Sequence, residues 1–145
     1  MRILALDYGS RRIGVAISDE LGMTAQGLTT ITRKGRPRDM ERIARLVDEY
    51  DVETVVIGYP VRLDGTEGIQ CEKVSKYAEI LRAHLSVPVI TWDESLSTKE
   101  AEDILIEAKV KRRKWRDVVD KMAATIILQG YLDGVNREKA EDLPR

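Results

Sequence analysis

Hydrophobic positions near the start of the chain fall into short runs that predict strands. Residues 2–7 and 12–18 are rich in Ile, Val, Leu and Ala, and residues 27–32 alternate between apolar and polar positions. Short apolar runs and strict alternation are both typical of β-strands. We therefore predict a meander of three strands, followed by a basic loop over residues 33–38.

Beyond this meander the pattern alternates between the helical period and short apolar runs. Apolar residues recur at helical spacing over 40–47 and 74–85, whereas residues 52–58 and 88–92 are nearly continuous apolar runs. Such runs are typical of strands buried on both faces. Alternating helices and strands favour a layered α/β domain with right-handed parallel crossovers.

The C-terminal part of the chain predicts two further helices. Residues 97–100 form a capping box, which begins one helix. Residues 117–132 predict a last helix, closed by Gly134 as its C-cap. We expect a single domain over residues 1–134 and a polar, frayed tail over 135–145.

Composition agrees with one globular domain. The chain has 145 residues, of which 43% are apolar and 34% charged. Its N-terminal apolar run is too short for a signal peptide, and no run approaches the ~20 residues of a membrane span, so we expect no membrane partner. The single cysteine, Cys71, excludes an internal disulfide and fits a reducing cytoplasm. With only one histidine, His84, the chain also lacks the ligands of a Cys/His zinc site.

The distribution of charge says more than the net charge of −1, which does not by itself indicate nucleic-acid binding. Residues 109–116 hold six basic residues in eight, and Trp115 lies among them. Cations that follow a phosphate backbone, with an aromatic ring that stacks on an unpaired base, are typical of single-strand binding. The alternative is a solvated connection between helices, with the tryptophan covering the core. The residues of this run predicted to contact nucleic acid are Lys111, Arg112, Arg113, Lys114 and Trp115.

Acidic residues follow two of the predicted strands. Asp7 ends the first strand, Asp93 and Glu94 follow the strand at 88–92, and Asp120 lies in the last helix. Because ligands bind at the carboxyl ends of parallel strands, these groups are candidates for one site. Carboxylates are rarely buried unless they are paired or bound to a metal. The alternative for Asp7 is a turn aspartate, and that for Asp93 and Glu94 is a helix-entry loop. For Asp120 it is a first-turn residue favoured by the helix dipole.

Such a cluster suits a hard divalent cation. Mg²⁺ prefers carboxylate oxygens and commonly binds phosphate as well. Two such ions about 3.5–4 Å apart can activate water and stabilise the leaving oxygen in phosphodiester cleavage. We expect Asp7, Glu94 and Asp120 to be both metal ligands and catalytic residues, for two ions of Mg²⁺ or Mn²⁺. Ala123 and Ala124 allow the last helix to pack close to the sheet.

The turn after the first strand carries two candidate phosphate contacts. Gly9 and Gly14 bracket Arg11 and Arg12, and backbone amides in such a turn can approach a phosphate. We therefore predict that Arg11 and Arg12 contact nucleic acid.

Four segments resemble, in order, the motifs of the YqgF (RuvX-like) nuclease family. Residues 7–16, beginning Asp-Tyr-Gly, are similar to its opening motif, and residues 58–65 to its Gly-Leu-Pro…Asp-Gly loop. Residues 92–98 resemble its Asp-Glu-Arg-Leu-Thr/Ser-Thr motif, and residues 120–132 its closing Asp-x-x-Ala-Ala motif. The chain departs from these motifs in the 58–65 loop, where Tyr59 replaces Leu and Val61-Arg62-Leu63 precedes Asp64-Gly65, and in Ser95, which replaces Arg.

The resemblance implies a ribonuclease-H-like fold, with a five-stranded mixed sheet in the order 3-2-1-4-5 flanked by helices. It implies a metal-dependent nuclease with Asp7, Glu94 and Asp120 as its acidic site. The family is associated with maturation of the 5′ end of pre-16S ribosomal RNA and is also described as a Holliday junction resolvase. Loss of the arginine at Ser95 removes a phosphate contact or a neighbour of the acidic motif, which affects substrate affinity more than metal binding.

RNA with an unpaired segment is the favoured partner, and branched DNA is the alternative. A junction resolvase needs a stable dimer with two sites facing one junction. The sequence has no extended apolar stripe beyond those of the core, so we expect a monomer or a weak homodimer. Two other functions compete: a non-catalytic nucleic-acid-binding module that keeps the fold, and an actin-like ATPase. The ATPase architecture needs two such domains around one nucleotide, and the sequence supplies one.

Overall fold

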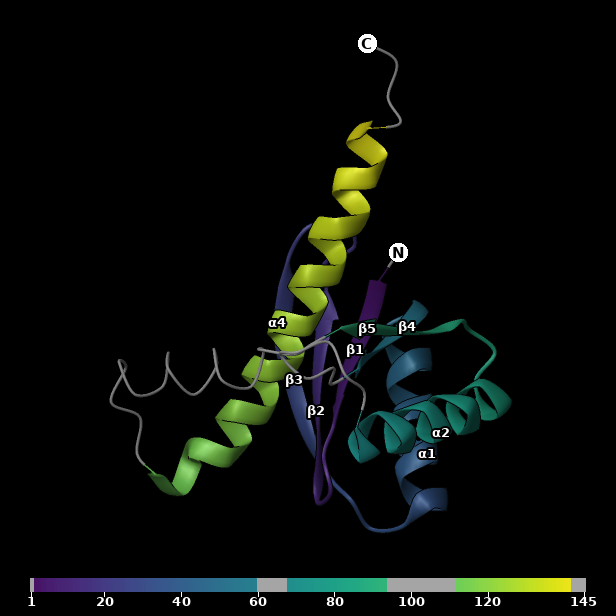
Figure 1. Cartoon of the computed structure of the whole chain (residues 1–145), viewed down its shortest axis with the longest axis vertical. Helices are drawn as coiled ribbons and strands as arrows, with labels where there is room; N and C mark the ends of the chain where they lie inside the picture. Colours follow the sequence, from purple (N-terminus) through teal and green to yellow (C-terminus); the bar gives the residue numbers. More distant parts are fainter. Residues whose placement is uncertain (1, 60–67, 94–111, 142–145) are drawn as a thin grey trace.

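The computed structural model describes residues 2–59, 68–93 and 112–141 of the chain (Figure 1). The predicted helix at 97–100 and the loop at 60–65 lie outside these residues. The elements follow in chain order: β1 Arg2–Tyr8, β2 Arg12–Ser18, β3 Ala25–Thr32, α1 Arg36–Glu49, β4 Val52–Tyr59, α2 Ile69–His84, β5 Val89–Asp93 and α4 Arg112–Glu141.

The five strands form one mixed sheet in the order β3-β2-β1-β4-β5. β1 pairs antiparallel with β2, and β2 with β3, which is the predicted meander. β1 pairs parallel with β4, and β4 with β5, through crossovers that contain α1 and α2. The sheet confirms the predicted fold class and strand order.

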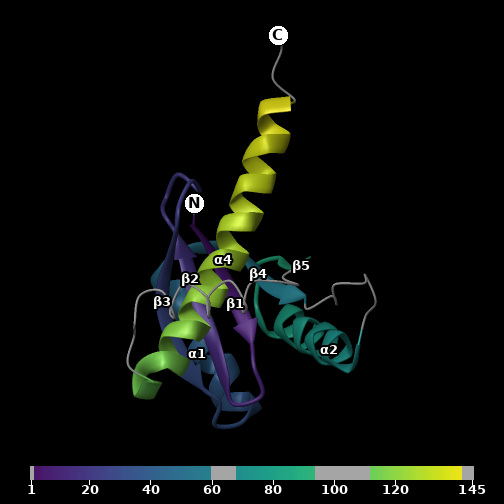
Figure 2. The same cartoon turned by 60° about the vertical axis from the view of Figure 1, so that its left-hand side comes forward.

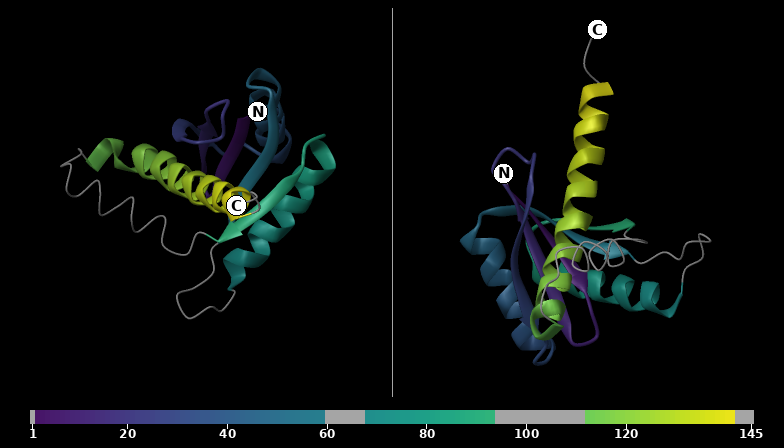
Figure 3. Two further views of the ribbon diagram at one scale, coloured as in Figure 1. Left: turned by 90° about the horizontal axis from the view of Figure 1, so that it is seen from above. Right: turned by 90° about the vertical axis from the view of Figure 1, so that its left-hand side faces the viewer.

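Helices cover both faces of the sheet (Figures 2 and 3). Residues of α1 and α2 pack with Leu4 and Leu6 of β1 in the larger core cluster. Ala5, between those two leucines, faces the other way and packs with residues of α4. This reversal follows the period of two in a strand. The two faces of β1 therefore contact different helical layers.

The layer under α4 includes small residues beside the larger Ile127, Leu128 and Leu132. Ala5, Ala16 and Val56 of the sheet meet Ala124 of α4, and Ala123 and Ala124 are both fully buried. Short side chains on both surfaces let a helix approach a sheet closely. The expectation that the two alanines allow close packing of the last helix is confirmed.

The prediction that the last helix covers residues 117–132 was wrong at both ends. α4 begins at Arg112 and continues through Gly134 to Glu141. Gly134 lies against the indole of Trp92, where an added Cβ would be 3.0 Å from the ring carbon Cη2. A glycine inside a helix costs about 1 kcal/mol relative to alanine. Here it makes room for a packed ring instead of ending the helix, so residues 135–141 are helical rather than a frayed tail.

Within the described part of the chain, no helix combines the length and apolar character that crossing a bilayer requires.

Candidate metal and nucleic-acid site

Asp7 lies near the end of β1, on the face covered by α4. It is directly opposite Gly14 in the antiparallel pairing of β1 with β2. Ala5, two residues earlier, packs in the α4 layer, so the alternation of the strand directs Asp7 toward the same helix. The Asp7 residue is half-buried. β1 thus presents one carboxylate at the edge of the α4 interface.

The main chain of α4 at Asp120 lies against Gly14, the residue that pairs with Asp7. A Cβ added to Gly14 would lie 2.0 Å from the carbonyl oxygen of Asp120 and 3.1 Å from its Cα. Only a residue without a side chain permits this approach. Because Asp7 pairs with Gly14, Asp7 and the main chain of Asp120 both adjoin Gly14 where α4 crosses β2.

Asp120 also forms an ion pair with Arg12. Nε of Arg12 donates a hydrogen bond to Oδ2 of Asp120 at 2.9 Å, and the two side chains are 27% and 22% exposed. The guanidinium thus contacts one of the oxygens that the sequence analysis assigned to metal. Arg12, predicted to contact nucleic acid, has a protein partner in this structure.

Arg12 and Asp120 also line a cavity beside the β1–β2 turn. Its volume is about 410 Å³, and its lining residues are Gly9, Ser10, Arg11, Arg12 and Asp120. Arg11 is exposed. Two cations and one carboxylate therefore face a space large enough for a phosphate group and its neighbours.

Asp93 does not join this group. The preceding residue, Trp92, packs in the α4 layer, with its ring edge-on to Tyr131 at a centroid separation of 5.5 Å. Strand alternation then directs Asp93 to the opposite face, which agrees with its pairing with Tyr59, a residue packed on the larger core cluster. Glu94 lies outside the described residues.

The donor set fits a hard cation as far as the structure describes it. Oxygen ligands from carboxylates are those that Mg²⁺ and Mn²⁺ prefer. In the ranges 2–59, 68–93 and 112–141, no three His, Cys, Asp or Glu residues gather as a metal site. Those ranges contain two of the three predicted ligands, Asp7 and Asp120.

The described part of the basic run, residues 112–116, is helical. Arg112 to Arg116 form the start of α4, whereas Lys111 lies outside the described residues. The first turn of α4 contains no acidic residue. Cations there oppose the helix dipole, so helix stability does not explain them. Arg112 precedes Asp120 by about 12 Å along the helix axis, which places the run on the same helix as the carboxylate.

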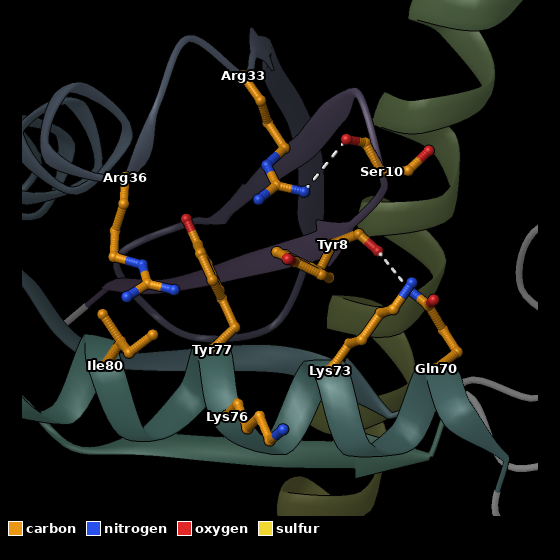
Figure 4. Close-up of a pocket in the computed structure, with 9 residues that line it drawn as sticks. All are labelled: Tyr8, Ser10, Arg33, Arg36, Gln70, Lys73, Lys76, Tyr77 and Ile80. Carbon is orange, nitrogen blue, oxygen red and sulfur yellow. Dashed lines mark hydrogen bonds between the residues drawn. The ribbon is translucent and has the colours of Figure 1, made fainter.

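One group of residues was missed by the sequence analysis. A second cavity, of about 400 Å³, opens on the α1 and α2 side of the sheet, and Arg33, Arg36, Lys73 and Lys76 are among its lining residues (Figure 4). The basic loop at 33–38 was visible in the sequence. Its approach to lysines of α2 depends on how the two helices pack, which the spacing of residues does not reveal.

The sheet order, with helices on both faces, defines a ribonuclease-H-like fold, and resolvases share it. The chain is similar to the Fowlpox virus resolvase, solved with its substrate Holliday junction DNA, with a TM-score of 0.58 and 14% identity over 93% of this chain and 99% of that one. RuvC of Thermus thermophilus gives a TM-score of 0.55 and 14% identity over 94% and 97% of the two chains. At this level of identity the likeness extends to the fold alone.

Sequence comparison identifies the family. The chain belongs to the RuvX family, whose model is described as "Holliday junction resolvase" and matches residues 1–134. A protein of Syntrophus aciditrophicus named "Putative pre-16S rRNA nuclease" is 63% identical over 139 residues, which are 96% of this chain and 93% of the relative. A protein of the same name from Halothermothrix orenii is 54% identical over 137 residues, 94% and 98% of the two chains. The predicted family resemblance is confirmed.

Proposed function

We propose that this protein is a metal-dependent nuclease that hydrolyses phosphodiester bonds, with the 5′ end of pre-16S ribosomal RNA as its substrate. The observation that carries the proposal is the approach of Asp120 to Gly14, the partner of Asp7. This approach places Asp7 and Asp120 at one glycine, next to a cavity that Arg11, Arg12 and Asp120 line, which supports a shared role. The names of the relatives support the substrate.

The third carboxylate in this proposal is Glu94. Asp93 is directed to the other face of the sheet, so it cannot approach Asp7 and Asp120 without a change in β5. Asp7, Glu94 and Asp120 would hold two ions of Mg²⁺ or Mn²⁺. When bound, such ions supply activation of the attacking water and stabilisation of the leaving oxygen.

The remaining residues are proposed to bind the substrate or to support the carboxylates. Arg12 balances the charge of the Asp120 carboxylate through its Nε hydrogen bond. Arg11, on the exposed turn, is available to a phosphate beside the carboxylates. We propose that the basic residues 112–114 at the start of α4 contact the same strand and that Trp115 stacks on an unpaired base.

A second candidate substrate is a four-way DNA junction. Two observations favour it: the description of the family model and the fold shared with junction resolvases. Paired cuts in a junction require a dimer with two sites facing one substrate. We propose that the protein is a monomer or a weak homodimer. RNA with an unpaired segment is therefore the preferred substrate.

Cleavage assays on three matched substrates test these alternatives. Purified protein is incubated with a 5′ precursor fragment of 16S RNA, single-stranded RNA and a four-way junction, each with Mg²⁺, Mn²⁺ or EDTA. We expect metal-dependent cleavage of the precursor and none by Asp7→Asn. Symmetric nicks in the junction alone would assign the resolvase function. Binding without cleavage of any substrate would assign a non-catalytic module.

A further inference from the structure

The cavity on the α1 and α2 side of the sheet is strongly basic. Among the described residues, its lining includes four cations, Arg33, Arg36, Lys73 and Lys76, and no carboxylate. Lys73 and Lys76 are three residues apart on α2 and so lie on the same side of that helix. Within the described part of the chain, Arg36, Lys73 and Lys76 form no ion pair. Their charges are therefore available to an anion.

Arg33 has a structural role in this cavity. Its Nη1 donates hydrogen bonds to the carbonyl oxygens of Gly9 at 3.1 Å and Ser10 at 3.2 Å, which ties it to the β1–β2 turn. Its Nε lies 3.9 Å from Oδ2 of Asp39, a buried carboxylate that balances its charge. The cavity is thus anchored to the same turn that carries Arg11 and Arg12.

The hydroxyl of Tyr77 is a hydrogen-bond donor that has no acceptor among the described residues. The residue is 4% exposed, and its hydroxyl has no hydrogen-bond partner among the described residues. In Figure 4 this hydroxyl lies between the guanidinium groups of Arg33 and Arg36. Burial raises the pKa of Tyr77, so the hydroxyl keeps its proton. Buried polar groups are normally paired, and an acceptor that enters between these cations would satisfy this one.

The aromatic rings of the cavity are already covered. The guanidinium of Arg33 lies 4.7 Å above the ring of Tyr8. The ring of Tyr77 lies 4.4 Å from that of Tyr8, between centroids, at a tilt of 39°. Because Tyr8 already contacts a guanidinium and a second ring, and the cavity is cationic, its chemistry suits a phosphate better than a base.

Ser10 belongs to both of the cavities described above. It lines the basic cavity and also the cavity that contains Arg12 and Asp120. We propose that the basic cavity binds a backbone phosphate of the nucleic-acid strand held at the carboxylate site, so that the strand passes around the β1–β2 turn. Arg36 and Lys73 supply the charge, and Tyr77 donates a hydrogen bond. This inference rests on the proposed nuclease function.

The salt dependence of RNA binding tests the inference without requiring cleavage. The variant Arg36→Gln/Lys73→Gln is compared with Arg42→Gln/Arg45→Gln, which removes the same charge from the exposed side of α1. Binding of a fluorescent single-stranded RNA is measured in EDTA across a series of salt concentrations. Each phosphate contact contributes about 0.7 to the slope of log K against log salt, so the cavity variant should lose up to about 1.4. The control variant should keep the slope of the unmodified protein.

A second variant separates the hydroxyl from the charges. Tyr77→Phe should weaken RNA binding several-fold and leave the salt slope unchanged, because the lost donor is neutral. Thermal unfolding of each variant confirms that it is folded before its affinity is compared. Equal slopes for the cavity and control variants would overturn the inference.

Free phosphate is the other source of the same chemistry. Inorganic phosphate and a mononucleotide are therefore added to the unmodified protein and to the cavity variant, and the Tm is recorded. Stabilisation by these ligands that needs the cavity residues, with an unchanged RNA slope, would assign the cavity to a free anion and overturn the strand path. If RNA binding depends on the cavity but no substrate is cleaved, the nuclease proposal fails and the phosphate site stands.

Discussion

Gly14 lies directly beneath the main chain of Asp120. The carbonyl oxygen of Asp120 is only 2.0 Å from the point that a Cβ at position 14 would occupy. The contact joins the central antiparallel pair of strands to the last helix. It sets how far the Asp120 carboxylate stands from the strand that carries Asp7.

Gly14→Ala tests this contact. The added methyl group must displace α4 or β2, and overpacking of this kind costs about 1–3 kcal/mol of unfolding free energy. We expect a lower Tm and a large loss of cleavage, because Asp120 moves away from Asp7. Denaturant unfolding and a cleavage assay measure the two effects. A variant with the Tm and turnover of the unmodified protein would contradict the close approach.

Asp7→Asn should abolish metal-dependent cleavage and leave the fold intact. Asparagine keeps the size of aspartate but loses the charge that holds a cation. Neighbouring carboxylates repel one another without metal, so the Tm should be unchanged or higher. Metal-dependent turnover and thermal unfolding are measured together.

The pair formed by Asp93 and Glu94 offers a matched control. Asp93→Asn should retain activity, because Asp93 is directed away from the α4 face, whereas Glu94→Gln should behave like Asp7→Asn. Both variants are assayed under the conditions used for Asp7→Asn. The reverse result would transfer the third ligand to Asp93.

Arg12→Gln should lower stability and strengthen metal binding. The half-buried ion pair with Asp120 contributes about 0.5–1 kcal/mol. Removal of the guanidinium also removes a positive charge next to a carboxylate that the proposal assigns to the cation, so the Kd for Mn²⁺ should fall. Calorimetric titration with Mn²⁺ measures the second effect. A weaker affinity for the metal would show that Arg12 assists metal binding by holding Asp120 in place.

The basic start of α4 should determine affinity and its salt dependence. Serine at positions 111–114 removes up to four phosphate contacts, or about 2.8 from the slope of log K against log salt. The single-turnover rate at saturating substrate should fall far less than the affinity. Since cations in the first turn oppose the helix dipole, the Tm should not decrease. An unchanged slope would show that the run does not contact the substrate.

Local patterns predicted most of the fold, and the family resemblance supplied the strand order. The strands and the first two helices follow from hydrophobic periodicity because each is determined by its own sequence. The end of α4 was missed because a glycine such as Gly134 can either end a helix or allow a close contact inside one. Only the packing of Trp92 of β5 against it shows that the second applies. The pairing of Arg12 with Asp120 was missed for a related reason: it joins residues 108 positions apart.

The sequence could propose which residues form the candidate site but not how they are arranged. Asp7 and Asp120 were chosen by chemistry and by resemblance, and the structure brings both to Gly14. The argument against Asp93 depends on the side of the sheet to which Trp92 points. Packing determines that side, and residue spacing does not reveal it. The basic cavity could not be predicted from the sequence, because it forms where α2 packs beside the start of α1.

The position of Asp120 in the last described helix has a consequence during synthesis. The ribosome makes β1 and its carboxylate first, and the helix that carries the second carboxylate almost last. Until α4 docks on Gly14, the nascent chain presents Asp7 without its neighbour. Because the proposed chemistry requires both carboxylates, we expect no cleavage of RNA, including the RNA of the protein's own ribosome, until α4 has been translated and has docked.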